Sequence, residues 1–296
     1  MKIGEINVRD PFILKHENKY YPYGTRSQTT CGLASGFDVY ISDDMENWSE
    51  PIAVFENDGS FWADRCYWPP ECYYHKGKFY IFITLASEKQ PSGTAIMIAD
   101  NPTGPFKPWS DGPINPHNWE CLDGTFYIDK KDVPYIVFSR SLKQEPKAGM
   151  YYMRLSEDLK FAIGEPKFMF FAAGTPWAKP FPYAKDEFGL KEDGYFSDGP
   201  YFHHSKSSKL LLLWSSWGEG EYSMGIAHSD NNELDGVWTQ EKEALYGDNG
   251  GHGMFFEENE ELFMVFHYPN TKNHERVKMQ KVEDIGDTIV LYQLAI

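Results

Sequence analysis

Hydrophobic and polar residues alternate through much of the chain, and few windows show the spacing of an amphipathic helix. The segment K-F-Y-I-F-I-T (residues 78–84) alternates, and K-L-L-L-L-W-S-S (residues 209–216) is a short apolar run that ends in small polar residues. Both patterns are typical of β-strands, the first half-buried and the second fully buried. The sequence therefore predicts an all-β protein built from short strands.

Five segments of the chain share one plan. Each places a titratable residue in a short turn rich in Gly or Pro, followed by a hairpin with aromatic-rich strands; they begin at Asp10, Glu71, Asp123, Asp198 and His252. A further strand that leads into an acidic turn follows each hairpin, so each repeat holds about four strands. The repeats start about 50 to 75 residues apart, which suits propeller blades with extended loops.

We therefore predict a single five-bladed β-propeller over residues 1–296, with the first strand of each blade lining a central channel. In this fold, the four acids and the histidine occupy one equivalent position in the five blades and converge on the axis. A pair of β-sandwiches with coincidental turns is the alternative. The shared register of the five segments argues against it.

Charge and composition limit the classes of molecule that the protein can bind. The net charge is −16 and aromatic residues make up 17% of the chain, so nucleic acid and anionic membranes are unsuitable partners, and a neutral substrate or a cation fits better. The four cysteines show neither zinc-ligand spacing nor a disulfide framework. No apolar stretch is long enough for a membrane helix, and the N-terminal residues have no apolar signal region. We expect a cytoplasmic protein, or a secreted one if a signal was removed; the oligomeric state is not predicted.

Carboxylates from separate blades point to glycosidic bond cleavage. Two carboxyl groups flanking a glycosidic bond suffice for hydrolysis, one as acid and one as base. Asp10, Asp123 and Asp198 are the candidates, and the third carboxylate would raise the pKa of the acid by like-charge repulsion. Groups that face each other across a channel leave room for an attacking water, and hence for inversion. The alternative is that each aspartate merely caps the turn before a strand.

His252 is a candidate metal residue. It lies in G-G-H-G-M, and the glycines on both sides allow the tight turn that would expose the ring toward the axis. Among oxygen donors and water, calcium is the expected ion. Because calcium prefers oxygen to imidazole, we expect His252 to act partly through water.

Several tryptophans lie near the starts of the repeats or the ends of their inner strands: Trp62, Trp68, Trp119, Trp177, Trp214 and Trp217. An aromatic face can stack on a sugar ring, and we expect Phe37, Trp62 and Trp68 to form such a platform together with Glu71. Packing between blades is the alternative use of these side chains.

The motifs resemble those of one family. R-D-P (residues 9–11), W-P-P-E (68–71), L-D-G-T-F-Y-I-D (122–129), D-G-P (198–200) and G-H-G-M (251–254) are similar, in content and order, to motifs of glycoside hydrolase family 43. The resemblance implies a five-bladed propeller that inverts configuration at α-L-arabinofuranosides or β-D-xylosides of plant polysaccharides. It implies Asp10 as general base, Asp123 as the carboxylate that orients the acid and raises its pKa, and His252 near a calcium site.

One position departs from the family pattern. The family's general acid is usually a glutamate in an E-G-P context, where this chain has Asp198 in S-D-G-P. Aspartate is one methylene shorter, about 1.5 Å, and a 1 Å misplacement can cost about 10²-fold in rate. We expect Asp198 to be the acid. Glu192, Glu219 and Glu221 are near enough in sequence to be substitutes.

Four functions therefore remain open. The first is an inverting exo-glycosidase on arabino- or xylo-oligosaccharides, for which the long interval 171–196 would close the pocket beyond one sugar. The second is an endo-arabinanase, which needs an open groove. The third is a carbohydrate-binding propeller with weak or lost catalysis, and the fourth is a retaining fructosidase-like propeller, which would normally open with N-D-P-N-G.

Overall fold

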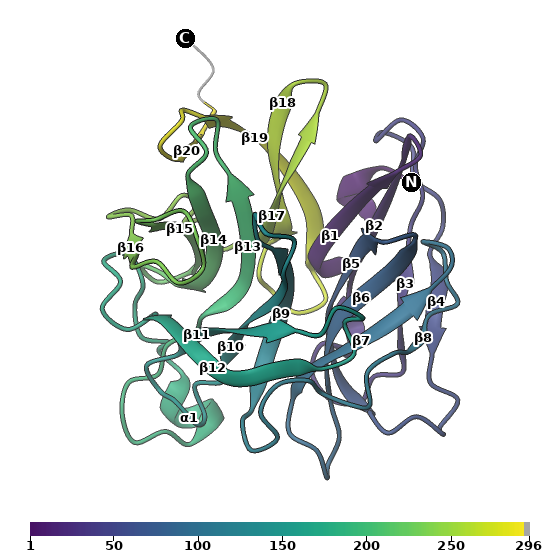
Figure 1. Ribbon diagram of the computed structural model, residues 1–296, viewed down its shortest axis with the longest axis horizontal. Coiled ribbons are helices and arrows are strands. Elements are labelled where there is room, and N and C mark those ends of the chain that lie inside the picture. Colours follow the sequence, from purple (N-terminus) through teal and green to yellow (C-terminus); the bar gives the residue numbers. More distant parts are fainter. Residues whose placement is uncertain (293–296) are drawn as a thin grey trace.

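The protein is a five-bladed β-propeller, as the sequence predicted. The computed structural model describes residues 1–292, so the last four residues of the predicted 1–296 domain lie outside the described part. Five four-stranded antiparallel sheets are arranged around a central axis (Figure 1). Each sheet uses four strands that are consecutive in sequence, so every blade is one repeat.

Each blade is a meander that runs outward from the axis. Blade 1 comprises β1 (Val8–His16), β2 (Lys19–Arg26), β3 (Gly36–Val39) and β4 (Ile52–Glu56). Blade 2 comprises β5 (Arg65–His75), β6 (Lys78–Ala86), β7 (Gly93–Ala99) and β8 (Lys107–Pro108). Blade 3 comprises β9 (Cys121–Ile128), β10 (Pro134–Arg140), β11 (Gly149–Leu155) and β12 (Ala162–Phe171). Blade 4 comprises β13 (Asp198–His204), β14 (Leu210–Trp217), β15 (Tyr222–Ser229) and β16 (Trp238–Gln240). Blade 5 comprises β17 (Gly251–Glu258), β18 (Glu261–Tyr268), β19 (Arg276–Asp284) and β20 (Ile289–Leu291).

The hydrophobic core lies between the blades. A separate cluster of buried side chains fills each of the five gaps between neighbouring sheets. The apolar run Leu210–Leu213 shows why: its side chains alternate between the gap toward blade 3 and the gap toward blade 5, so no face of this strand is solvated. Each such leucine contributes roughly 1.5–3 kcal/mol when fully buried. Packing on both faces explains why strict alternation is lost in the central strands.

The ring closes by packing, without a shared sheet. Blade 1 uses only N-terminal strands and blade 5 only C-terminal strands within residues 1–292. Across this seam the Val277 amide donates to the Ile6 carbonyl, and the Arg9 guanidinium donates to the fully buried Glu275 carboxylate at 3.2 Å. The Ser27 hydroxyl donates to the same carboxylate. A buried ion pair with further hydrogen bonds thus connects the N-terminal blade 1 to the C-terminal blade 5.

A β-bulge recurs near the start of all five inner strands. At the bulge each strand has one residue with a left-handed backbone conformation, with φ between 51° and 58°: Asp10, Cys66, Asp123, Gly199 and His252. A bulge re-aims a side chain, and a non-glycine residue held there costs roughly 1–3 kcal/mol. The predicted register is therefore correct in blades 1, 3 and 5. It is wrong in blade 2, where Cys66 holds the position, and in blade 4, where Asp198 lies one residue before it.

One insertion stands out from the blades. Residues 172–197 connect β12 to β13 and include α1 (Ala184–Phe188), at the lower left of Figure 1. Phe181 anchors it, because its ring packs at 4.9 to 5.1 Å from the rings of Phe196 and Trp217. The two short 3-10 helices are η1 (Ile3–Glu5) and η2 (Ser27–Thr29).

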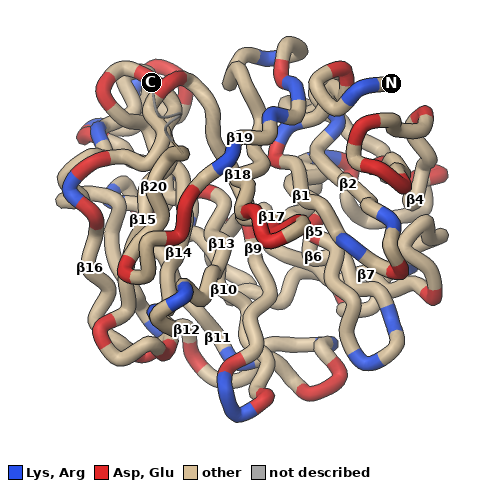
Figure 2. Tube along the Cα trace, turned by 90° about the horizontal axis from the view of Figure 1, so that it is seen from above, with Lys and Arg blue, Asp and Glu red and all other residues tan. Residues whose placement is uncertain are grey.

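Acidic and basic residues are interspersed along the loops that surround the blades (Figure 2). Within residues 1–292, no helix has the length and apolar character required to cross a membrane. The four cysteines are all unpaired.

Candidate active site

A pocket lies at one end of the central channel. Its volume is about 480 Å³, within the usual range for small-molecule sites. The three predicted carboxylates, Asp10, Asp123 and Asp198, all line it, and so does His252. They come from the inner strands β1, β9, β13 and β17, so the structure does bring the predicted catalytic residues together.

Asp10 is a buried carboxylate with several partners. Its Oδ2 accepts a hydrogen bond from the Thr25 hydroxyl at 3.0 Å, and its Oδ1 lies 3.6 Å from Arg9 Nε and 3.2 Å from His267 Nδ1. Burial alone would raise the pKa of Asp10, but the neighbouring His252, Arg9 and His267 together lower it below its ordinary value. Burial lowers the pKa of His252 to about 4 and also lowers that of His267, so Arg9 remains as the charged stabilising neighbour at neutral pH. Asp10 is therefore ionised, as a general base must be.

The other two aspartates titrate in the opposite direction. Burial, followed by the charges of Asp198 and Asp10, raises the pKa of Asp123 well above its ordinary value. Burial also raises the pKa of Asp198 to about 7, although a hydrogen bond from the Tyr222 hydroxyl opposes the change. Asp123 Oδ2 accepts a hydrogen bond from the Gly199 amide at 3.0 Å. One ionised and two proton-holding carboxyl groups thus face one pocket, which separates base from acid.

Backbone amides at the bulges are held by side chains of the preceding blade. The Asp123 amide donates to Thr84 Oγ1 at 2.8 Å, and the His252 amide donates to Ser215 Oγ at 2.8 Å. The Asp10 amide donates to His267 Nδ1 at 3.2 Å. Each acceptor belongs to the second strand of its blade. The strained conformation of each functional residue is therefore supported from outside its own strand.

The ring of His252 points into a crowded part of the channel. Its Nδ1 lies 3.5 Å from Asp10 Oδ1 and 3.7 Å from Asp123 Oδ2, whereas its buried Nε2 has no hydrogen-bond partner. Gly199 makes room for the ring, because a Cβ at this position would lie 2.8 Å from it. An unpartnered buried nitrogen fits a water or a hydrated ion. However, no three His, Cys, Asp or Glu side chains of residues 1–292 are grouped to hold a metal by themselves.

Glu71 is buried and does not line the pocket. It is 5% exposed, and its Oε2 accepts a hydrogen bond from the Tyr73 hydroxyl at 2.6 Å. Burial raises the pKa of Glu71 to about 7. Tyr73 in turn packs against Phe12, whose ring lies 4.9 Å from the Tyr73 ring and 6.4 Å from the Tyr201 ring. Glu71 was predicted to bind substrate directly, and this position does not fit that role.

Aromatic side chains form much of the pocket wall. Trp68, a predicted platform residue, lines the pocket and donates through Nε1 to the Thr30 carbonyl at 2.7 Å. The prediction for Phe37 is wrong, because this ring is completely buried between blades 1 and 2. Trp62 packs against the same cluster and is not among the pocket residues. The remaining aromatic residues of the wall come mostly from the insertion and blade 4: Phe181, Tyr183, Phe196, Trp217 and Tyr222.

The three substitute acids lie outside the pocket. Glu192, Glu219 and Glu221 are exposed, and Glu219 pairs with Lys179 at 3.5 Å. The insertion instead contributes a different glutamate, Glu187 of α1, to the pocket lining. No motif marks this residue, and only its place in the long interval 171–196 could have suggested it.

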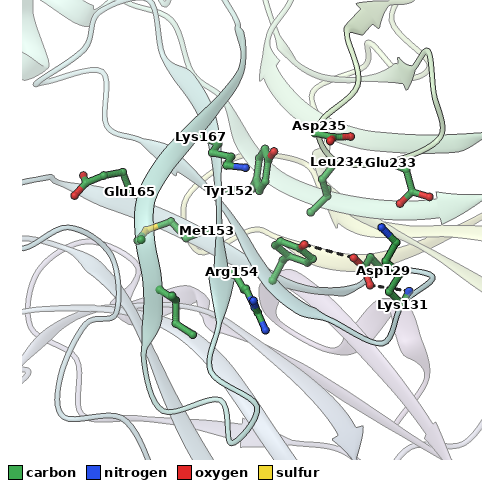
Figure 3. A pocket seen from close by; sticks show the side chains of 13 residues that line it. Asp129, Lys131, Tyr152, Met153, Arg154, Glu165, Lys167, Glu233, Leu234 and Asp235 are labelled. Carbon is green, nitrogen blue, oxygen red and sulfur yellow. Dashed lines mark hydrogen bonds between the residues drawn. The ribbon is translucent and has the colours of Figure 1, made fainter.

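A second hollow on the flank of blades 3 and 4 has a different character (Figure 3). Its volume is about 340 Å³, and its lining mixes acids such as Asp129 and Glu233 with Lys131 and Lys167. The Tyr135 hydroxyl donates to Asp129 at 3.4 Å. None of the convergent carboxylates of the channel reaches it, so the channel pocket is the candidate active site.

Comparisons with known proteins agree with this geometry. The sequence model of the family described as Glycosyl hydrolases family 43 matches residues 3–291. The fold is similar to that of an endo-arabinase from Bacteroides thetaiotaomicron VPI-5482, with a TM-score of 0.85 and 31% identity over 96% of each chain. It is also similar to a thermostable family-43 glycoside hydrolase (TM-score 0.80, 21% identity, 99% of this chain and 95% of that one). An endo-1,4-beta-xylanase from the same Bacteroides strain follows (TM-score 0.73, 20% identity, 98% and 95%). No curated protein sequence matches the chain.

Proposed function

Because the chain belongs to glycosyl hydrolases family 43 and is a glycosidase, we propose that it cleaves α-L-arabinofuranosyl or β-D-xylosyl linkages with inversion of configuration. The observation that carries this proposal is the opposite titration of Asp10 and Asp198 in one pocket. The pKa of Asp10 is lowered, whereas burial raises that of Asp198 to about 7. An ionised base and a protonated acid therefore coexist near neutral pH.

In the proposed reaction, Asp10 takes a proton from water as the water oxygen bonds to the anomeric carbon. Asp198 gives its proton to the glycosidic oxygen as the bond from that oxygen to the anomeric carbon breaks. Asp10 ends protonated and Asp198 ionised, and exchange with solvent restores both. Asp123 would orient the acid, while burial and the charge of Asp10 raise the pKa of Asp198.

Two observations favour inversion over retention. Asp10 and Asp198 belong to blades 1 and 4 and line the same cavity, so the sugar and a water can lie between them. Asp10 is also held on both oxygens by neighbouring groups, Thr25 on Oδ2 and Arg9 on Oδ1. Such contacts stabilise a carboxylate that accepts a proton and returns to the same state.

Arabinofuranosyl linkages are the preferred substrate within this proposal. The neighbour with 31% identity is an endo-arabinase by name. The insertion with Phe181 and Tyr183 bounds the pocket on one side, which favours action at a chain end or on short oligosaccharides. Such substrates would suit the cytoplasmic site expected from the sequence.

A calcium ion is part of the proposal only in hydrated form. His252 Nε2 has no hydrogen-bond partner and could accept a hydrogen bond from a water bound to the ion. Water would supply most of the ligands of the ion itself. Such an ion would add positive charge that offsets repulsion among the carboxylates.

The proposal is tested with three substrates side by side: an aryl α-L-arabinofuranoside, an aryl β-D-xyloside and debranched arabinan. We expect turnover of the arabinofuranoside and a loss of about 10²–10⁴-fold in the Asp10→Asn variant with sugar binding retained. A wild-type protein that binds arabino-oligosaccharides but cleaves none of the three substrates would establish the alternative, a carbohydrate-binding propeller.

A further inference from the structure

The hydroxyl of Tyr222 reaches the predicted acid. It donates a hydrogen bond to Asp198 Oδ2 at 3.0 Å, and both side chains line the pocket. Tyr222 is 3% exposed, so little of its side chain contacts bulk water. It begins β15, two strands away from the innermost strand that carries Asp198.

The ring of Tyr222 is clamped from two sides. It stacks on His267, with 5.8 Å between the ring centroids and 17° between the planes. The ring also packs directly against Gly251, where a Cβ would lie 2.2 Å from a ring carbon. Any side chain at position 251 would displace the ring, so the glycine keeps the path of Tyr222 to Asp198 open. A clamped ring holds its hydroxyl in one place.

We propose that Tyr222 is a positioning residue for Asp198, and that it fixes the short side chain by binding Oδ2 so that Oδ1 carries the proton to the glycosidic oxygen. This inference rests on the proposed function. It explains how Asp198 can act as the general acid at a position where the family pattern has the longer glutamate. A carboxyl group bound on one oxygen cannot rotate freely, so its proton is presented from a defined direction.

The same contact sets the titration of the acid. A hydrogen bond to the ionised form stabilises it, so the Tyr222 contact keeps the pKa of Asp198 lower than burial alone would. The other charged or titratable groups around the pair are Arg9 and Asp10 of β1, Asp123 of β9 and His267 of β18. Removal of the hydroxyl leaves all of them in place.

The test is Tyr222→Phe, which keeps the ring over Gly251 and deletes only the hydroxyl. We expect kcat on an arabino-oligosaccharide to fall about 10-fold or more, with KM changed little. On a dinitrophenyl arabinofuranoside, whose leaving group needs little protonation, the loss should be small. The basic limb of the kcat–pH profile should move to higher pH, because the acid loses a contact that favours its ionised form.

Tyr127→Phe is the matched control, since Tyr127 is 6% exposed, its hydroxyl has no partner and it lies outside the pocket. It should change neither the leaving-group dependence nor the pH profile. In an Asp198→Ala background, Tyr222→Phe should cause no further loss. Tyr222→Gln, whose amide can donate, should retain more activity than Tyr222→Leu, and this comparison holds even if Tyr222→Phe folds poorly.

Equal losses on both substrates with an unmoved basic limb would reduce Tyr222 to a packing residue and overturn the inference. A wild-type enzyme that cleaves both substrates while Tyr222→Phe behaves like wild type would do the same and leave the proposed function intact. A wild-type protein that cleaves neither substrate contradicts the proposed function itself.

Discussion

Glu71→Gln is the substitution that most directly probes electrostatics in the channel. Glu71 is 5% exposed and accepts its hydrogen bond from Tyr73. Burial raises its pKa from 4.5 to about 7. Glutamine keeps an oxygen acceptor for the Tyr73 hydroxyl and removes the proton that must be lost as pH rises.

The size of the effect follows from linkage between protonation and folding. Below pH 4.5 both the folded and the unfolded chain hold the proton, and Glu71 adds no pH dependence. Between pH 4.5 and about 7 only the folded chain holds it, so the free energy of unfolding falls by about 1.36 kcal/mol per pH unit. Above pH 7 both states are ionised and the penalty is constant, at most about 3 kcal/mol. The raised pKa thus gives stability that is complete at low pH and lost toward neutrality.

The assay is urea unfolding of wild type and Glu71→Gln at pH 4.5 and pH 8. We expect the two proteins to differ little at pH 4.5, and the variant to be more stable by up to about 3 kcal/mol at pH 8. Glu243→Gln, at an exposed position, is the control, and its free energy of unfolding should differ from that of wild type by the same amount at both pH values. A Glu71→Gln difference that is equal at both pH values would show that folding does not shift the pKa of Glu71, and would refute the reasoning.

Three other changes test the remaining parts of the site. Asp198→Ala should cost about 10²–10⁴-fold on an arabino-oligosaccharide and far less on a dinitrophenyl arabinofuranoside; equal losses, with Glu187→Ala showing the leaving-group dependence instead, would move the acid to α1. His267→Ala should lower kcat about 10-fold or more because the Asp10 amide loses its acceptor, and His267→Gln, which can accept that bond, should recover part of the loss; identical rates for the two variants would contradict this. Dialysis against a chelator should lower the melting temperature if a calcium ion faces His252, and elemental analysis that finds no metal together with an unchanged melting curve would remove the ion from the account.

The blades were predictable because they follow from local pattern. Four strands with apolar residues on both faces, closed by tight turns, recur five times and need no long-range information. The convergence of the candidate aspartates and His252 was predictable for a related reason. Each lies beside Gly or Pro near the start of an inner strand, and in blades 1, 3 and 5 the bulge falls on the titratable residue itself.

The predicted register was wrong in blades 2 and 4 because the position of a bulge depends on the backbone conformation and not on a titratable side chain. Cys66 and Gly199 adopt the same left-handed conformation as Asp10 without offering a carboxylate. A search for titratable residues therefore chose Glu71, five positions beyond the bulge of its strand. Asp198 still reaches the pocket because it immediately precedes the bulge.

Residues that support the site from other strands left no signal in the sequence. His267 of blade 5 reaches Asp10 of blade 1, and Tyr222 of β15 reaches Asp198 of β13 within blade 4, but both stand in ordinary strands without a motif. Phe37 shows the reverse problem, since an aromatic residue in a core strand has the same local pattern as one that faces a sugar. Burial between sheets, which depends on the neighbouring blade, decides between these roles.

The central claim is that Asp10 activates water for direct displacement at the anomeric carbon. The most direct measurement is proton NMR of the first-formed sugar during cleavage of an α-L-arabinofuranosyl oligosaccharide, before the anomers equilibrate. The account predicts that the β-anomer of arabinose appears first, because a single displacement inverts the configuration. An α-anomer that appears first would require a covalent glycosyl-enzyme intermediate and would contradict the assignment of Asp10 as a base.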